Sequence, residues 1–318
     1  MFKFDFDVEP DAASPANRPA STAARQTTTD ATTVNAETVH HASGAHSSLA
    51  EETILATPAT PNACVENFCE IRSEDVTVVQ HDTGHGDKPQ QPPIRQTAGV
   101  QHLAAPVASG GGDEDRGDGD VYERAERSHS DLIPQVYEGG YKVWECTLDL
   151  LNVLDDRPEL VRGTTLLDLG CGVGLAGLKA AQQGATEVHF HDYNASVLRK
   201  LTVHNSRLLK TTCPMRFFAG DWTLFQCPVK YDIILTSETI YRPENYGPLC
   251  DLFDRCLVQP NGKVVVAAKA VYYGVGGTMV DFLEFCARRG WKTGRPLRQE
   301  TSGVRREVVL LTKSTSED

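Results

Sequence analysis

A glycine-rich turn follows a short apolar stretch near the middle of the chain, in the sequence LLDLGCGVGLAG. Gly170, Gly172 and Gly174 allow a tight turn and a close approach of the backbone to a ligand, because no Cβ atom intervenes. Residues 172–177 also match the G-x-G-x-x-G pattern of dinucleotide sites, which is a weak signal when it stands alone. Asp168 places a carboxylate just before the glycines, where dinucleotide folds carry apolar residues, and this favours a ligand with an ammonium group.

Two more acids end the apolar stretches that come next. Asp192 closes EVHFHD, where it can accept hydrogen bonds from ribose hydroxyls. Asp221 lies in GDW, in which Trp222 adds an aromatic face. If the three stretches are parallel strands, the acids meet at the carboxyl edge of the sheet, where such folds bind ligands. A ligand with an amine, a ribose and an adenine fits this set, which indicates S-adenosylmethionine.

The elements that must position these residues alternate between apolar stretches and helical periods. The expected strands are 165–170, 187–192, 215–220, 231–238, 263–269 and 305–313. The expected helices are 141–154, 173–184, 196–209, 246–259 and 278–290. In the first helix, one face is expected to carry Val143, Leu148, Leu151 and Leu154. The pattern predicts an α/β domain with a doubly wound, mostly parallel sheet and an antiparallel last strand.

Composition divides the chain into two parts. Residues 1–120 contain 7 Lys and Arg against 19 Asp and Glu, whereas residues 121–318 contain 24 of each, so the net charge of −12 comes from the first part. Residues 1–120 are rich in Ala, Thr, Ser, Pro, Gly and Asp and show no sustained period, so we expect a disordered acidic tail. FKFDF near the start and a stretch at 66–79 are expected to be transient there. We expect one globular domain over 121–318.

Cysteine usage and hydropathy restrict the class of protein. The nine cysteines form no CxxC pair and no zinc-type spacing, so we expect reduced thiols and no metal site. No apolar run reaches the length of a membrane span, and the first ten residues carry acids where a signal peptide needs an apolar core. A folded domain of zero net charge argues against direct, sequence-specific binding of nucleic acid.

Several motifs together resemble one enzyme family. DLGCGVG, SHSDLIPQVYEGGYKVWECT, HDYN, GDW, LTSETIY and AAKAVYYGVGG are similar to the protein-histidine branch of the seven-strand S-adenosylmethionine-dependent methyltransferases, over about 128–313. The resemblance implies a Rossmann-like domain and methylation of a histidine in the third large-subunit ribosomal protein. It also implies a role in ribosome biogenesis or translation, a monomer, and a location in cytoplasm and nucleus or nucleolus.

The resemblance also assigns roles to residues of the cofactor pocket. It implies that the methionine part of the cofactor contacts the glycine turn and that the ribose contacts Asp192 and Tyr193. Ser237 is expected to lie below the sulfonium. The adenine is expected between Gly220, Asp221 and Trp222. One wall of the pocket is expected from Val143, Trp144, Glu145, Cys146 and Thr147.

The acceptor side is expected after the fourth strand, in SETIY, where lysine-modifying relatives carry Asp-x-x-Tyr and this chain has Glu238-x-x-Tyr241. Imidazole, with a pKa near about 6.5, is largely neutral at cell pH and needs orientation of one ring nitrogen more than deprotonation. Our hypothesis is that Glu238 or Tyr241 hydrogen-bonds the other ring nitrogen. The loop 272–277 is a candidate to receive the acceptor peptide.

Three alternatives remain open at this point. Protein-lysine methylation would use the same fold and cofactor. NAD-dependent oxidoreduction would follow from the literal dinucleotide pattern, although Asp168 speaks against it. A cofactor-binding, chaperone-like protein without transfer activity is the third alternative. His189 and His191 are expected to be structural rather than metal ligands, and Cys171 to line the pocket rather than act as a nucleophile.

Overall fold

The computed structural model describes residues 68–76, 94–103 and 137–313. Most of the predicted acidic tail, including FKFDF, lies outside the described residues, as do the first residues expected for the domain. All described residues belong to one compact unit of the chain.

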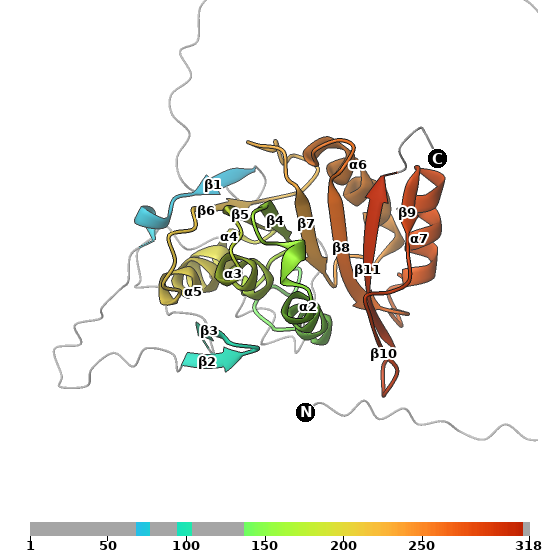
Figure 1. Cartoon of the computed structure of the whole chain (residues 1–318), viewed down its shortest axis with the longest axis horizontal. Helices are drawn as coiled ribbons and strands as arrows, with labels where there is room; N and C mark the ends of the chain where they lie inside the picture. The colour runs from blue at the N-terminus through green and yellow to red at the C-terminus, as the bar shows by residue number, and fades with distance from the viewer. Residues whose placement is uncertain (1–67, 77–93, 104–136, 314–318) are drawn as a thin grey trace, which may run out of the picture. The chain divides into compact units, whose positions relative to one another are not determined.

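One mixed sheet organises the described part of the chain (Figure 1), in the order β1-β6-β5-β4-β7-β8-β11-β10, with β9 also paired to β11. β6, β5, β4, β7 and β8 run parallel to one another, while β11 is antiparallel to β8, β9 and β10, as the sequence predicted for the last strand. A separate two-stranded sheet pairs β2 with β3. The strands are β1 Cys69–Ile71, β2 Ile94–Thr97, β3 Val100–Leu103, β4 Thr165–Leu169, β5 Glu187–Asp192, β6 Met215–Ala219, β7 Ile233–Ser237, β8 Lys263–Lys269, β9 Trp291–Thr293, β10 Arg298–Glu300 and β11 Arg306–Lys313.

Helices cover both faces of the sheet, which confirms the doubly wound prediction. Alternate strand residues point to opposite faces, so Leu166 packs with the first group of helices and Leu167 with the second. The first group is α2 Glu145–Asp156, α3 Leu175–Gln182, α4 Ala195–Val197, a π-helical turn Leu198–Thr202 and α5 Val203–Leu208; the second is α6 Tyr246–Cys256 and α7 Met279–Arg288. Short 3-10 helices span Ser73–Asp75, Pro158–Leu160 and Pro243–Asn245.

Helix α2 ends two residues later than predicted and buries part of the predicted face. It begins at Glu145, so Val143 lies before it, and Leu148 is 39% exposed. Leu151 and Leu154 are buried as predicted, and Cys146 and Leu150, which share a face with Leu154 at a spacing of four residues, are buried with them. The predicted face is therefore confirmed for Leu151 and Leu154, and it is wrong for Leu148 and for Val143.

Two segments of the predicted tail are part of the folded unit, which corrects that prediction for them. β1 pairs antiparallel with β6, and Phe68 next to it stacks on Phe218 at 5.9 Å and on His191 at 6.3 Å. Arg216 of β6 donates to both carboxylate oxygens of Glu70, each at 2.8 Å. A short strand at a sheet edge takes its stability from such cross-strand contacts rather than from its own sequence.

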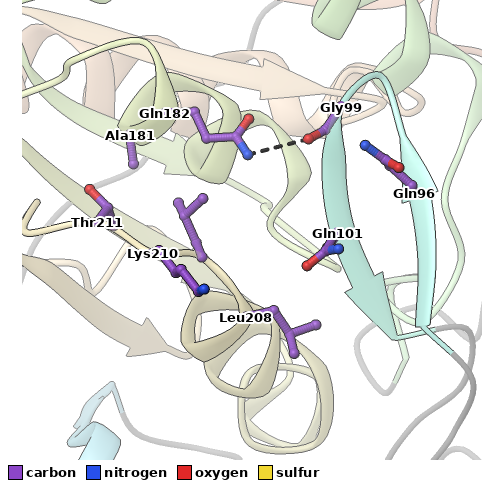
Figure 2. A pocket seen from close by; sticks show the side chains of 9 residues that line it. Gln96, Gly99, Gln101, Ala181, Gln182, Leu208, Lys210 and Thr211 are labelled. Atoms are coloured by element: carbon purple, nitrogen blue, oxygen red, sulfur yellow. Dashed lines mark hydrogen bonds between the residues drawn. The ribbon is translucent and has the colours of Figure 1, made fainter.

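The β2–β3 hairpin packs beside α3 and α5. The ammonium of Lys179 donates to the carbonyl of Ala98 at 2.7 Å, and Gln182 Nε2 donates to the carbonyl of Gly99 at 3.3 Å, as Figure 2 shows for Gln182. A cavity of about 440 Å³ lies between the hairpin and the two helices, with Gln96, Gln182 and Thr211 in its lining. Val100, 1% exposed, fixes the hairpin to the core.

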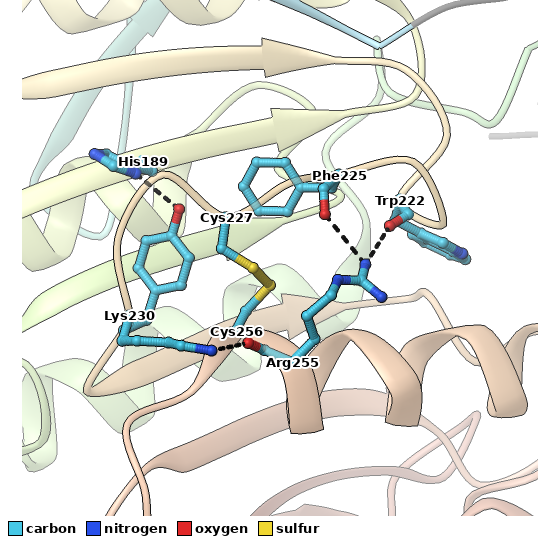
Figure 3. The surroundings of a disulfide bond; sticks show 8 residues. His189, Trp222, Phe225, Cys227, Lys230, Arg255 and Cys256 are labelled. Carbon is cyan, nitrogen blue, oxygen red and sulfur yellow. Dashed lines mark hydrogen bonds between the residues drawn. A yellow bond between two sulfur atoms is a disulfide. The ribbon is translucent and has the colours of Figure 1, made fainter.

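The structure contains a disulfide between Cys227 and Cys256, so the expectation of reduced thiols is wrong for this pair. Cys227 follows β6 in the chain and Cys256 ends α6, so the bond joins the loop after β6 to that helix (Figure 3). Spacing could not reveal the pair, because the two cysteines are 29 residues apart. Cys250 and Cys286 are a second close pair, with Sγ atoms 3.4 Å apart and no bond between them.

Removal of residues 1–120 is expected to lower the melting temperature by roughly 5–15 °C, because it removes the buried side chains of Ile71, Val76 and Val100. Calorimetry of the truncated and full chains measures this change. A chain that lacks only residues 1–55 keeps every described residue and is the matched control. Equal melting temperatures for the two truncations would contradict a stabilising role of β1 and the hairpin.

Candidate active site

A cavity of about 810 Å³ lies at the carboxyl edge of the parallel strands. Each parallel strand from β4 to β8 contributes residues from its end or from the loop that follows it. The segment before α2 supplies another part of the lining, from Glu138 to Thr147. The volume lies within the range of about 300–1,000 Å³ that small-molecule sites occupy. The sequence predicted this location from the acids that end successive strands.

The glycine-rich turn after β4 presents its backbone to the cavity. Gly170 and Gly172 line it with φ angles of +66° and +51°, in the left-handed region that favours glycine. The amide of Gly172 donates to Asp192 Oδ2 at 2.9 Å, and its carbonyl accepts from Thr202 Oγ1 at 2.6 Å. A Cβ atom on Gly172 would lie 3.0 Å from the carbonyl oxygen of Gly140. The turn is therefore fixed by β5 and by the π-helical turn before α5, and Gly172 has no room for a side chain.

Asp168 does not line the cavity, which corrects its predicted position against the cofactor. Its side chain is buried, and Oδ2 accepts a hydrogen bond from the amide of Gly177 at 2.7 Å. Burial raises the pKa of Asp168 to about 7, the Gly177 amide lowers it, and the charge of Asp192 adds to the rise. Asp168 thus anchors the start of α3 to β4. It supports the glycine turn between these two elements without lining the cavity.

Twelve of the predicted site residues line the cavity and five do not. Those in the lining are Val143, Trp144, Thr147, Gly170, Gly172, Asp192, Tyr193, Asp221, Trp222, Ser237, Glu238 and Tyr241. Those outside it are Glu145, Cys146, Asp168, Gly174 and Gly220. A Cβ atom on Gly174 would lie 2.6 Å from Thr202, so this glycine allows α3 to pack closely on its neighbours. Cys146 is buried on the inner face of α2.

The loop after β6 carries Asp221 and Trp222 and is held in place by α6. Arg255 of α6 donates to the carbonyl of Trp222 at 3.1 Å and to that of Phe225 at 3.2 Å, close to the Cys227–Cys256 disulfide (Figure 3). Asp221 Oδ1 accepts from the amide and the hydroxyl of Thr223, both at 2.8 Å. Tyr193 also lines the cavity, and its pKa is raised by burial and by the charges of Asp221 and Glu138.

Glu238, the first residue after β7, is a buried carboxylate at the cavity. Its φ of +59° is unusual for a non-glycine residue, and such conformations cluster at functional sites. Its side chain is 8% exposed, and Oε2 accepts from the hydroxyl of Tyr272 at 2.6 Å. Oε1 is buried without a hydrogen-bond partner among the described residues and lies 3.8 Å from the ammonium of Lys269. One oxygen of the carboxylate thus keeps an unused hydrogen-bond acceptor in the wall of the cavity.

Tyr241 is engaged by its neighbours. Its hydroxyl donates to Glu138 and accepts from Arg242 at 2.9 Å, while Arg242 pairs with Glu138 at 3.0 Å. Burial and the hydrogen bond to Glu138 raise the pKa of Tyr241 to about 12. These contacts join the loop after β7 to the segment before α2, and all three residues line the cavity.

Several lining residues were missed in the sequence. The most informative are Glu138, Arg242, Lys269 and Tyr272. Glu138 and Tyr272 lie in the quoted motifs VYEGG and YYGVGG, so motif membership was the available signal. Lys269 ends β8 at the same sheet edge as the acids. Its position at a strand end was the available signal, but a search for carboxylates alone overlooks a lysine.

The lining fits S-adenosylmethionine chemically. Gly170 and Gly172 expose backbone that a Cβ atom would cover, Asp192 ends β5 beside the turn, and Tyr193 and Trp222 provide aromatic faces. These five residues would hold the cofactor, and the part of the cavity that they line is called its cofactor half. Cys171 also lines the cavity, as predicted, and burial raises its thiol pKa, which leaves it a poor nucleophile.

Within the described ranges, no three His, Cys, Asp or Glu side chains are grouped closely enough to bind a metal ion. His189 instead bonds Tyr231 Oη at 2.8 Å and Glu187 at 2.7 Å, and His191 packs at 5.4 Å from Phe225. None of the described helices is both long and apolar enough to cross a membrane.

Comparisons with known proteins agree with this site. A family model described as "Lysine methyltransferase" matches residues 136–274. The "Histidine protein methyltransferase 1 homolog" of Rattus norvegicus is 37% identical over 251 residues, which cover 69% of this chain and 69% of that protein. The homolog of Bos taurus is 40% identical over 225 residues, which cover 60% of each chain.

More distant matches include lysine-modifying enzymes. The "EEF1A lysine methyltransferase 3" of Mus musculus is 26% identical over 130 residues, 40% of this chain and 55% of that protein. Among solved structures, the magnesium protoporphyrin IX methyltransferase of Synechocystis with bound S-adenosylhomocysteine matches with a TM-score of 0.43 and 15% identity, over 63% of this chain and 97% of that one.

Gly172→Ala is expected to weaken the binding of S-adenosylmethionine by about tenfold or more, because the added Cβ presses on the Gly140 carbonyl and changes the turn. Isothermal titration measures the affinity. Gly163→Ala is the matched control, since Gly163 also has a positive φ, +73°, but nothing within 4 Å of the new Cβ. Unchanged affinity in Gly172→Ala would show that the turn does not contact the ligand.

Asp168→Asn is expected to gain stability relative to the unmutated chain as the pH rises from about 4 to 7. The folded-state pKa of about 7 lies above the unfolded value of about 3.9, so the unmutated protein loses stability across this window, because the carboxyl ionises in the unfolded chain while it stays protonated in the folded one. Urea unfolding at several pH values should show a difference that grows by up to about 1.4 kcal/mol per pH unit. Asp156→Asn, at an exposed position, is the control. A pH-independent difference would contradict the raised pKa.

Proposed function

The chain belongs to the family of histidine protein methyltransferases, which are S-adenosylmethionine-dependent enzymes, and from this membership we propose that it methylates a histidine of a large-subunit ribosomal protein. By resemblance, the acceptor is the third protein of that subunit. The observation that carries the assignment of the acceptor side is Glu238, which lines the cavity and whose buried Oε1 has no hydrogen-bond partner among the described residues.

The arrangement suits a neutral imidazole. An imidazole donates an N–H from one ring nitrogen and presents a lone pair on the other. Glu238 Oε1 can accept that N–H, which fixes the tautomer and turns the second nitrogen towards the cofactor half of the cavity. When bound, S-adenosylmethionine supplies an electrophilic methyl group on a sulfonium. The chain's main contribution is then position and exclusion of water.

Proton transfer needs only one residue in this scheme. Attack by the neutral ring uses its lone pair and requires no prior deprotonation. The methylated ring carries a positive charge and an N–H on its other nitrogen, and Glu238 Oε1 accepts this proton before its release to water. Thr147 Oγ1 and Ser237 Oγ, 2.9 Å apart, fix the wall between α2 and β7 next to this residue.

Tyr241 supports the site without taking the acceptor's proton. Its hydroxyl is engaged by Glu138 and Arg242, and its pKa of about 12 makes it a poor base at neutral pH. Of the two residues in the original hypothesis, the geometry therefore favours Glu238.

The choice of a ribosomal substrate rests on the family resemblance and on charge. Residues 1–120 carry a net charge of −12, which favours association with a basic client such as a ribosomal protein. We extend the proposal to action as a monomer in cytoplasm and nucleus, with a role in ribosome biogenesis or translation. Lysine methylation is the second candidate, since the matching family model is described as "Lysine methyltransferase".

Transfer of labelled methyl groups to ribosomal proteins tests the proposal. The purified full chain is incubated with labelled S-adenosylmethionine and a large-subunit ribosomal protein fraction, and the labelled band is hydrolysed. Methylhistidine in one ribosomal protein is the expected product. Methyllysine would overturn the acceptor assignment, and binding of the cofactor without any transfer would favour a chaperone-like role.

Glu238→Gln is expected to lower kcat by about 100-fold, because the amide keeps the shape but cannot accept the proton. Tyr241→Phe, which also removes one polar group from the cavity lining, is expected to stay within about threefold of the unmutated rate, since it loses only a supporting bond. Initial rates at saturating cofactor measure both. Full activity of both variants with an unchanged methylhistidine isomer would remove Glu238 and Tyr241 from the mechanism.

A further inference from the structure

Lys269, the last residue of β8, places an ammonium group among four side chains at the acceptor end of the cavity. Its Nζ lies 3.8 Å from Glu238 Oε1 and 3.6 Å from Glu145 Oε2. The same atom lies over the ring of Trp144, 5.2 Å from the centroid, and 5.8 Å from that of Tyr272. An ammonium bounded by two carboxylates and two aromatic faces is stabilised in one position.

The two carboxylates differ in what they need from this lysine. The Glu145 side chain is 58% exposed, so water can solvate it and its pairing contributes little. The Glu238 side chain is 8% exposed, and burial of an ionised carboxylate is costly unless a cation compensates it. Among the ion pairs of the described residues, Glu238 pairs only with Lys269. Lys269 is thus the counter-charge of the group that meets the acceptor.

This counter-charge decides which acceptor the site can take. A carboxylate already balanced by an ammonium can still accept a hydrogen bond from a neutral N–H, as imidazole offers. A substrate lysine arrives as a second ammonium, which meets a like charge a few ångströms away. To enter as a neutral amine it must first lose a proton, and at pH 7.4 only about one lysine in 1,000 is neutral, whereas most imidazole is.

We propose that Lys269 is a specificity-determining residue. By neutralising the charge of the Glu238 carboxylate, it makes the site select a neutral imidazole over a lysine ammonium. The inference rests on the proposed function and extends it from the reaction to the choice of acceptor. Tyr272 assists, because its hydroxyl bond to Oε2 leaves Oε1 as the oxygen for both Lys269 and the substrate.

The test compares two acceptors for each variant of the full chain. The first is the ribosomal protein labelled by the unmutated enzyme, and the second is the same protein with the labelled histidine replaced by lysine. Lys269→Met should raise the ratio of lysine to histidine methylation by about tenfold or more, because it frees the Glu238 carboxylate to pair with a substrate ammonium and then to accept the proton that the amine must lose before it attacks the methyl group. Binding of both acceptors, measured by titration in the presence of S-adenosylhomocysteine, should shift in the same direction.

Three further variants separate charge from structure. Lys269→Arg keeps the positive charge and should retain the preference for histidine. Lys263→Met, at the exposed start of the same strand, is the matched control and should change nothing. If Lys269→Met does not fold, Glu238→Gln replaces it: with the ammonium left uncompensated, binding of the lysine acceptor should weaken further relative to the histidine acceptor.

The outcomes distinguish this inference from the function on which it rests. An unmutated enzyme that produces no methylhistidine contradicts the proposed function itself. An unmutated enzyme that does produce it, together with a folded Lys269→Met variant whose acceptor ratio and binding ratio are unchanged, overturns only the role of Lys269. A loss of preference in Lys269→Arg would point to side-chain shape rather than charge and would also overturn it.

Discussion

A carboxylate removed from water must have its charge balanced, and the acceptor end of the cavity is arranged around this requirement at Glu238. The residue sits directly after β7 in a left-handed conformation, so its side chain is buried beside the sheet edge. Tyr272 donates to one of its oxygens, and Lys269 supplies the opposite charge near the other. Because Lys269 also lies against Trp144, this network joins β7, β8 and the segment before α2. The proposed position of the acceptor rests on these contacts.

The cofactor half depends on a different contact, between a carboxylate and a backbone amide. Asp192 at the end of β5 accepts from the amide of Gly172, so two neighbouring strands fix the glycine turn together. Gly172 keeps the turn open, since a Cβ atom there would meet the segment before α2. That segment therefore borders both halves of the site, and Glu138 joins it to Tyr241 and Arg242 after β7. Methyl transfer requires the two halves to be placed with respect to each other, and this segment connects them.

The sequence predicted the doubly wound sheet, because buried parallel strands and helical periods are local signals that packing did not override. It also located the site, since acids that follow successive parallel strands meet at one edge. Asp168 was misplaced because a strand residue can point away from the edge, and here its carboxylate binds the amide of Gly177. β1 and the β2–β3 hairpin were missed because their stability comes from contacts with distant residues, such as Arg216 with Glu70 and Lys179 with Ala98. The Cys227–Cys256 disulfide depends on tertiary proximity in the same way.

The most direct test of the account is a crystal structure of the full chain with S-adenosylhomocysteine and a histidine-containing substrate peptide. The account predicts that one imidazole nitrogen donates to Glu238 Oε1, within hydrogen-bond distance, while the other faces the sulfur of the cofactor product. Lys269 should remain beside the Glu238 carboxylate in that complex. An imidazole that bonds to Tyr241 or Asp221 instead, with Glu238 in contact only with Lys269 and Tyr272, would contradict the central role given to this buried carboxylate.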